Sequence, residues 1–205
     1  MRRFLGWLAV LWMGWSGAAL AAAPKTVLVL GDSLSAAHNI ATNQGWVHLL
    51  EVRLGKMEPP WRVVNASISG ETTLSGRHHL PRLLASYRPA VLVLELGAND
   101  GLRGLPLDAL EDNLGAMIDM AREAHARVLL LGIELPVNYG PRYRDGLRAV
   151  YADLARRRHT ALVPFLLENV ALDPSLMQDD GLHPTAAGEP VVLETVWAQL
   201  APLLR

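Results

Sequence analysis

The chain has 205 residues, of which 51% are hydrophobic, and its formal net charge is −1. This length suits one domain with a sizeable core, and no basic stretch interleaved with aromatic residues points to a nucleic-acid partner. The chain contains no cysteine, which excludes disulfides, thiolate zinc sites, a cysteine nucleophile and a lipoprotein anchor.

The N-terminus has the pattern of a bacterial secretory leader. Arg2 and Arg3 precede an apolar stretch from Phe4 to Leu20, and Ala19-Leu20-Ala21 matches the A-x-A cleavage pattern. We therefore predict a signal peptide over residues 1–21, one folded domain over residues 22–205, and a periplasmic or secreted protein without a stable membrane anchor. The alternative is a retained anchor, although the apolar stretch is marginal against the roughly 20 residues of a spanning helix.

Apolar runs alternate with amphipathic segments along the rest of the chain, and no repeat or linker-like tract divides it. We expect strands at residues 26–30, 62–66, 90–96, 127–133 and 160–165. We expect helices at residues 46–54, 72–87, 107–124, 143–158 and 185–204. The strands are apolar at consecutive positions, which is typical of strands buried on both faces. The alternation predicts an α/β fold with a mainly parallel five-stranded sheet.

Small polar clusters follow three of these strands: Gly31-Asp32-Ser33, Ser69-Gly70-Glu71 and Gly97-Ala98-Asn99-Asp100. Ligands of open parallel sheets bind outside the carboxyl ends of the strands. A serine at that edge is placed for chemistry, so Ser33 is our candidate nucleophile.

A serine nucleophile needs a base, and His183 is the best candidate among the seven histidines. Asp180 stands three residues before it, and in a turn this spacing can place the carboxylate beside the ring. Pro184 restricts His183 to an extended conformation. Asp179 is expected to point elsewhere. The alternative is a loop that only caps the last helix.

Negative charge that develops on a carbonyl oxygen needs hydrogen-bond donors. The candidates are the backbone N–H groups of Ser33 and Gly70 and the carboxamide of Asn99. Taken singly, Gly70 is equally explained by a turn and Asn99 by a cap.

Asp32 is expected to brace the nucleophile loop, because a residue adjacent to Ser33 in extended backbone points the opposite way. Asp100 is expected to brace its own turn. The remaining histidines lack carboxylate partners at helpful spacing and are interpreted as surface or helix residues: His38, His48, His78, His79, His125 and His159. No H-E-x-x-H or C-x-x-C motif occurs, so we expect no metal and no cofactor.

The ordered set Gly31-Asp32-Ser33-Leu34, Gly70, Asn99 and Asp180-x-x-His183 resembles the sequence blocks of the GDSL, or SGNH, hydrolase family. The resemblance covers essentially the whole chain after the leader. It implies a flavodoxin-like three-layer α/β/α sandwich, a triad of Ser33, Asp180 and His183, and an oxyanion hole of Ser33, Gly70 and Asn99. One position departs, because the third block commonly reads Gly-Gly-Asn-Asp and here has Ala98. If that residue needed a positive φ, alanine would cost about 1 kcal/mol or more.

The resemblance also implies hydrolysis of acyl esters and thioesters, including aryl esters and lysophospholipids. Six residues in loops at the edge that carries Ser33 are expected either to line an acyl groove or to pack against each other: Leu102, Leu105, Pro106, Leu135, Pro136 and Tyr139. Two other functions stay open, a carbohydrate O-deacetylase of the same family and a flavodoxin-like binding module. The oligomeric state is not encoded in any pattern that we recognise.

Overall fold

The computed structural model describes residues 24–205, so the predicted signal peptide lies outside the described residues. Its sheet consists of β1 (Thr26–Gly31), β2 (Arg62–Asn65), β3 (Val91–Glu95), β4 (Arg127–Leu131) and β5 (Ala161–Val163). The strand order is β2-β1-β3-β4-β5, and every neighbouring pair is parallel. The predicted five-stranded parallel sheet is therefore confirmed.

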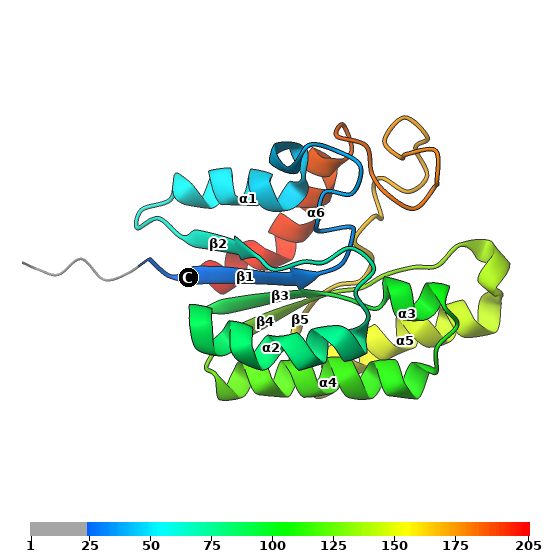
Figure 1. Ribbon diagram of the computed structural model, residues 1–205, viewed down its shortest axis with the longest axis horizontal. Coiled ribbons are helices and arrows are strands. Elements are labelled where there is room, and N and C mark those ends of the chain that lie inside the picture. Colours follow the sequence, from blue (N-terminus) through cyan, green and yellow to red (C-terminus); the bar gives the residue numbers. More distant parts are fainter. Residues whose placement is uncertain (1–23) are drawn as a thin grey trace, which may run out of the picture.

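Helices cover both faces of this sheet (Figure 1). On one face lie α1 (Trp46–Gly55) and α6 (Glu189–Leu200), which contact each other. On the other lie α2 (Thr73–Tyr87), α4 (Leu107–Glu123) and α5 (Pro141–Arg157). The result is the expected three-layer α/β/α sandwich. Within residues 24–205, no helix is both long and apolar enough to cross a bilayer.

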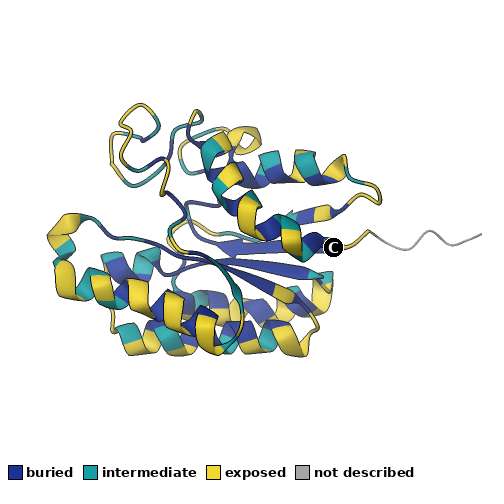
Figure 2. Cartoon of the chain, turned by 180° about the vertical axis from the view of Figure 1, so that it is seen from behind, coloured by how far each residue is buried: buried dark blue, intermediate teal, exposed yellow. Residues whose placement is uncertain are grey.

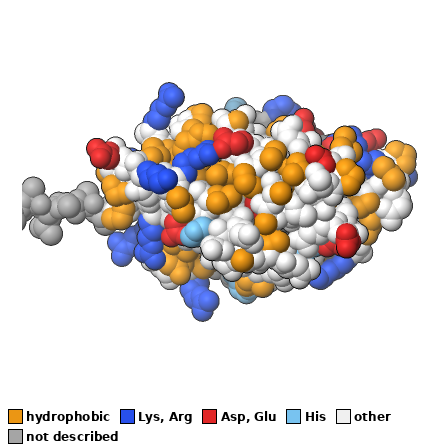
Figure 3. All heavy atoms as spheres, turned by 90° about the horizontal axis from the view of Figure 1, so that it is seen from above, with side chains coloured by type: hydrophobic (Ala, Val, Ile, Leu, Met, Phe, Trp, Pro, Cys, Tyr) orange, Lys and Arg blue, Asp and Glu red, His pale blue; other side chains and the backbone are white. Residues whose placement is uncertain are grey.

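The sheet is the centre of the hydrophobic core. Every residue of β1 and β3 is buried, because helices cover both faces of these central strands (Figure 2). Each aliphatic side chain removed from water in this way contributes about 1.5–3 kcal/mol. The outer surface over α1 and α6 mixes apolar, acidic and basic side chains and shows no broad area of one charge (Figure 3).

Two segments differ from the predicted elements. A short helix, α3 (Ala98–Leu102), follows β3 where we expected a loop. The last helix begins at Glu189 rather than Thr185, because Thr185 still belongs to the preceding loop, where its N–H donates to the carbonyl of Leu176 at 2.8 Å. The described residues also contain single-turn 3₁₀ helices at Thr42–Gln44, Val137–Tyr139 and Ala201–Leu204.

Candidate active site

Ser33 lies in a tight turn directly after β1. Oδ1 of Asp32 accepts the Leu34 N–H at 3.1 Å, and the Asp32 carbonyl accepts the Ala36 N–H at 3.0 Å. These bonds bend the chain at the carboxyl end of the central strand. The nucleophile candidate is therefore held at the edge of the sheet where its sequence position placed it.

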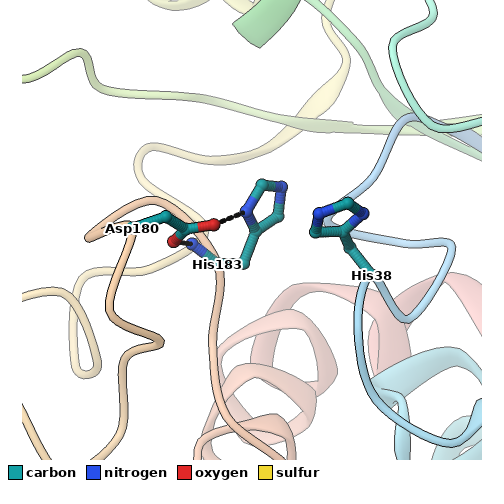
Figure 4. Close-up of side chains that lie close together, drawn as sticks. All are labelled: His38, Asp180 and His183. Carbon is teal, nitrogen blue, oxygen red and sulfur yellow. Dashed lines mark hydrogen bonds and ion pairs between the residues drawn. The ribbon is translucent and has the colours of Figure 1, made fainter.

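The structure brings His183 and Asp180 to Ser33. Nε2 of His183 lies 2.8 Å from Oγ of Ser33, and Nδ1 lies 2.7 Å from Oδ2 of Asp180. Figure 4 shows the carboxylate pointing at the ring. The adjacent Asp179 is exposed, and no hydrogen bond involves its side chain within the described chain. The three residues thus form one continuous line of hydrogen bonds.

The loop that carries this pair is closed on itself. Met177 and Pro184 form an isolated antiparallel bridge, and the Gln178 N–H donates to the His183 carbonyl at 2.8 Å. Oδ1 of Asp180 accepts the N–H groups of Leu182 and His183 at 2.9 and 3.1 Å. The orientation of the carboxylate is consequently fixed from within the loop.

These donors also determine the charge of Asp180. Partial burial opposes ionisation, but the hydrogen bonds from the Leu182 N–H and from the ring and N–H of His183 outweigh it and lower the pKa of Asp180 to about 2. Asp180 is therefore ionised at neutral pH. An ionised acceptor beside Nδ1 holds the ring proton there and leaves the Nε2 lone pair facing Ser33.

The backbone donors expected around Ser33 are available. In the described part of the chain, the N–H groups of Ser33 and Gly70 have no acceptor. Gly70 has φ +82, and the Arg103 guanidinium donates to its carbonyl at 3.2 Å. The left-handed backbone suits glycine. Because neither N–H group has an acceptor among the described residues, both are free to donate to an incoming oxygen.

Asn99 differs from the expectation in one respect. Its Nδ2 donates to Oδ2 of Asp32 at 3.0 Å and to the Glu71 carbonyl at 3.1 Å. Both amide protons are thus directed at the protein, and Asn99 can serve a substrate oxygen only by sharing one of them. The positive φ in this segment, +127, belongs to Gly97, while Ala98 begins α3. The departure at Ala98 therefore causes no strain.

Glu95, at the end of β3, was missed by the sequence reasoning. Its side chain is completely buried, and its Oε2 accepts the Asp32 N–H at 3.1 Å and the Ser35 hydroxyl at 2.8 Å. Burial raises the pKa of Glu95 well above its usual value and that of Asp32 to about 6. The only available signal was an acidic residue inside an otherwise apolar strand.

Asp32 and Asp100 both act as braces, but only Asp32 does so as predicted. Asp32 holds the loop of Ser33, whereas the prediction for Asp100 is wrong. The Asp100 carboxylate does not hold its own turn; it accepts the N–H and hydroxyl of Thr73 at 2.9 and 2.6 Å. It therefore fixes the start of α2 against α3.

The prediction that the other histidines lack carboxylate partners is wrong at two positions. Nδ1 of His79 lies 2.7 Å from Oε1 of Glu71, and Nδ1 of His48 lies 3.4 Å from Oε2 of Glu51. Glu71 and His79 are eight residues apart, and the turn before α2 brings them together. His38 is also more than a surface residue, because its ring packs against His183 with centroids 4.3 Å apart.

A cavity of about 320 Å³ opens beside Ser33, Asn99 and His183. Leu102, Leu135 and Pro136 line it, as expected for an acyl groove, but Leu105, Pro106 and Tyr139 do not. Tyr139 instead donates its hydroxyl to the Leu102 carbonyl at 3.0 Å. The loop after β5 supplies apolar residues that the sequence did not indicate: Phe165, Leu167, Ala171, Leu172 and Met177.

Comparison with known proteins agrees with this geometry. The model of the GDSL-like Lipase/Acylhydrolase family matches residues 29–189. Esterase TesA of Pseudomonas aeruginosa is 53% identical over 183 residues, 89% of this chain and 91% of the relative. Thioesterase 1/protease 1/lysophospholipase L1 of Escherichia coli K12 is 42% identical over 90% of this chain and 87% of its own length.

Solved structures show the same architecture. A crystal structure of TesA has a TM-score of 0.85 and 52% identity over 87% of this chain and 99% of that chain. The psychrotrophic esterase EstA from Pseudoalteromonas sp., in a structure inhibited by monoethylphosphonate, has a TM-score of 0.82 and 36% identity over 88% and 98% of the two chains. The chain belongs to the GDSL-like lipase/acylhydrolase family and is a carboxylic ester hydrolase.

Proposed function

We propose that the chain hydrolyses acyl esters and thioesters through an acyl-enzyme on Ser33. The single observation that carries this proposal is the unbroken line from Oγ of Ser33 to Nε2 of His183 and from Nδ1 to Asp180. Such a line lets the ring accept the hydroxyl proton while the carboxylate stabilises the resulting imidazolium.

In the first half of the reaction, Oγ of Ser33 attacks the acyl carbonyl as His183 takes its proton. The tetrahedral intermediate then expels the alcohol or thiol, which receives that proton from His183. In the second half, His183 takes a proton from a water molecule as the water attacks the acyl-enzyme, and it returns this proton to Oγ of Ser33 as the acid leaves. Asp180 stays ionised throughout, because its pKa is about 2.

The oxyanion is stabilised by the free N–H groups of Ser33 and Gly70 and by Asn99. For Asn99 to take part, one proton now directed at Asp32 or Glu71 turns toward the substrate. Asp32 is buried, and this burial raises its pKa to about 6. A buried carboxylate is costly to leave without a hydrogen-bond donor. We infer that the bond to the Glu71 carbonyl is the one that is shared.

The proposed substrates carry an acyl chain, because the cavity beside Ser33 is lined mainly by apolar residues. The relatives' names, esterase, thioesterase, lysophospholipase and arylesterase, support aryl esters, lysophospholipids and acyl thioesters as classes to test. The leader pattern supports a periplasmic or secreted site of action.

The test is hydrolysis of p-nitrophenyl esters from acetate to palmitate, repeated with the corresponding thioesters. We expect activity on both and a preference for chains longer than acetate. Ser33→Ala should abolish turnover and labelling by a fluorophosphonate, and a Ser33→Ala enzyme with full turnover overturns the mechanism. A strong preference for acetate would instead favour the O-deacetylase.

A further inference from the structure

A second histidine faces the catalytic pair. The rings of His38 and His183 lie with centroids 4.3 Å apart and are tilted by 36°. Figure 4 shows His38 on one side of His183 and Asp180 on the other. One ligand atom from each residue can be chosen so that all three lie within 4.8 Å of one another.

The loop that carries His38 is fixed by contacts of its backbone. The residues on both sides of it, Ala37 and Asn39, have φ of +57 and +56. This conformation costs about 1–2 kcal/mol for a side chain such as alanine. Nε2 of Gln178 donates to the His38 carbonyl at 2.9 Å and to the Pro184 carbonyl at 2.7 Å, which ties the two histidine loops together. A strained position that is fixed by neighbouring contacts is a reason to look for a function.

We propose that His38, His183 and Asp180 bind a divalent transition-metal ion, with Zn²⁺ as the probe, and that the bound ion inhibits hydrolysis. Two imidazole nitrogens and a carboxylate oxygen are a donor set that zinc prefers, with water completing the tetrahedron. Zinc–ligand distances near 2.1 Å place ligand atoms about 3.3 Å apart. His38 and His183 are partly exposed and Asp180 is exposed, so a hydrated ion has access and the side chains have room to converge.

Inhibition follows from the chemistry of His183. A neutral imidazole has one lone pair, which lies on Nε2 when the Nδ1 proton is held by Asp180. An ion that is also held by Asp180 binds Nδ1, because Asp180 lies on that side of the ring. It displaces the Nδ1 proton and separates the ring from the Asp180 carboxylate. The only ring proton then moves to Nε2, so His183 has no lone pair for the Ser33 proton and can no longer act as the base.

The inhibitory effect rests on the proposed function, whereas metal binding does not. Two measurements therefore separate the two proposals. The first is the rate of hydrolysis of a p-nitrophenyl ester, and the second is calorimetric titration of Zn²⁺ into Ser33→Ala, which keeps all three ligands.

The decisive variant is His38→Phe, which keeps an aromatic ring against His183 but removes the ligand nitrogens. We expect Zn²⁺ to inhibit the wild-type enzyme, a chelator to restore it, and Mg²⁺ to have no effect. The inhibition constant should rise by more than about tenfold in His38→Phe. His48→Phe is the matched control, because His48 also stands beside a carboxylate; its zinc inhibition should equal that of the wild type.

In the calorimeter, Ser33→Ala should bind one Zn²⁺ per chain, more weakly at low pH because the ligands must be deprotonated. The double variant with His38→Phe should lose this binding, and His38→Asn repeats the test if the phenylalanine variant does not fold. Equal inhibition of wild type and His38→Phe, or no zinc binding to Ser33→Ala at millimolar concentration, overturns the proposal. If Zn²⁺ binds but the wild-type enzyme does not hydrolyse the ester, the proposed function alone is refuted.

Discussion

Asp32 and Asp180 both lie beside residues of the proposed active site, and their surroundings shift their pKa values in opposite directions. Asp180 is exposed and accepts three hydrogen bonds within its loop, so its pKa falls to about 2. Asp32 is completely buried beside Glu95, and burial raises its pKa to about 6 despite the bonds it accepts. An orienting acid must stay charged when the base turns cationic, whereas a bracing acid only has to accept hydrogen bonds. Access to water, rather than closeness to Ser33 in the sequence, distinguishes the two roles.

The largest expected effect follows from removing the charge of Asp180. Asp180→Asn keeps the size of the side chain but offers the ring an amide, which permits the wrong tautomer of His183. We expect kcat to fall by about 10⁴-fold with little change in KM, measured on a p-nitrophenyl ester. Asp179→Asn is the matched control and should behave like the wild type. Comparable losses in the two variants would show that Asp180 has no special role.

A smaller loss of kcat is expected when the side-chain amide of Asn99, which donates to Asp32, is removed. Asn99→Ala removes the proposed third oxyanion donor, and we expect kcat to fall by about 10²–10³-fold. Asn169→Ala removes an exposed amide that does not line the cavity and donates instead to the Thr195 hydroxyl, and it should leave kcat unchanged. A kcat of Asn99→Ala within a few fold of the wild type would mean that both protons of Asn99 stay on the protein during catalysis.

The effect of burial on an acidic side chain is tested at Glu95, which lies beside Asp32. Burial raises the pKa of Glu95 well above its usual value and so favours the neutral carboxyl, so Glu95→Gln should change kcat by less than a few fold. Glu95→Ala leaves the Asp32 N–H and the Ser35 hydroxyl without an acceptor and should lower the free energy of unfolding by about 1–3 kcal/mol. Urea unfolding of both variants measures the difference. If glutamine is as damaging as alanine, a charged Glu95 is required and the assignment of its protonation is wrong.

The last effect concerns stability alone, without a change in activity, and a third buried acid. Glu189 accepts the Trp46 N–H at 2.7 Å at the start of α1, and burial raises its pKa to about 7. Between the unfolded pKa near 4.5 and this value, the folded state binds a proton that the unfolded state releases. Stability must then fall as pH rises from about 4.5 to 7, by up to about 1.4 kcal/mol per pH unit.

Glu189→Gln removes this titration and keeps an acceptor for Trp46. Its melting temperature relative to the wild type should therefore rise steadily across the window from pH 4.5 to 8. Glu194→Gln is the control, because Glu194 lies on the same helix but its pKa is lowered by Arg53. A difference in melting temperature that is flat with pH for Glu189→Gln would contradict the buried-acid assignment.

The features that the sequence predicted correctly are local ones. The run Val27–Leu30 is apolar at every position and is followed by a glycine and a polar pair, so the strand and its end could be predicted without the fold. Asp180 and His183 are three residues apart, and their contact depends only on a turn. These two local patterns contain the residues that form the line of hydrogen bonds in the site.

The features that were missed depend on contacts between distant segments. Glu95 meets Asp32 only because β3 pairs with β1, and Asp100 meets Thr73 only when α2 docks beside α3. His38 reaches His183 across 145 positions of sequence because a strained loop turns it inward. No periodicity or short spacing in the sequence encodes these contacts, because they follow from strand order and packing.

The bridge between Met177 and Pro184 has a consequence for how activity is gained and lost. Asp180 and His183 sit on one self-closed loop, which is joined to the segment of Ser33 by the contact between His183 and Ser33 and by the bond from Gln178 to the His38 carbonyl. We therefore expect the proposed acid and base to move together as one unit. Opening of this loop would remove activity while the sheet and its helices stayed folded, so we expect the local stability of the loop, rather than that of the whole domain, to set the lifetime of the active state.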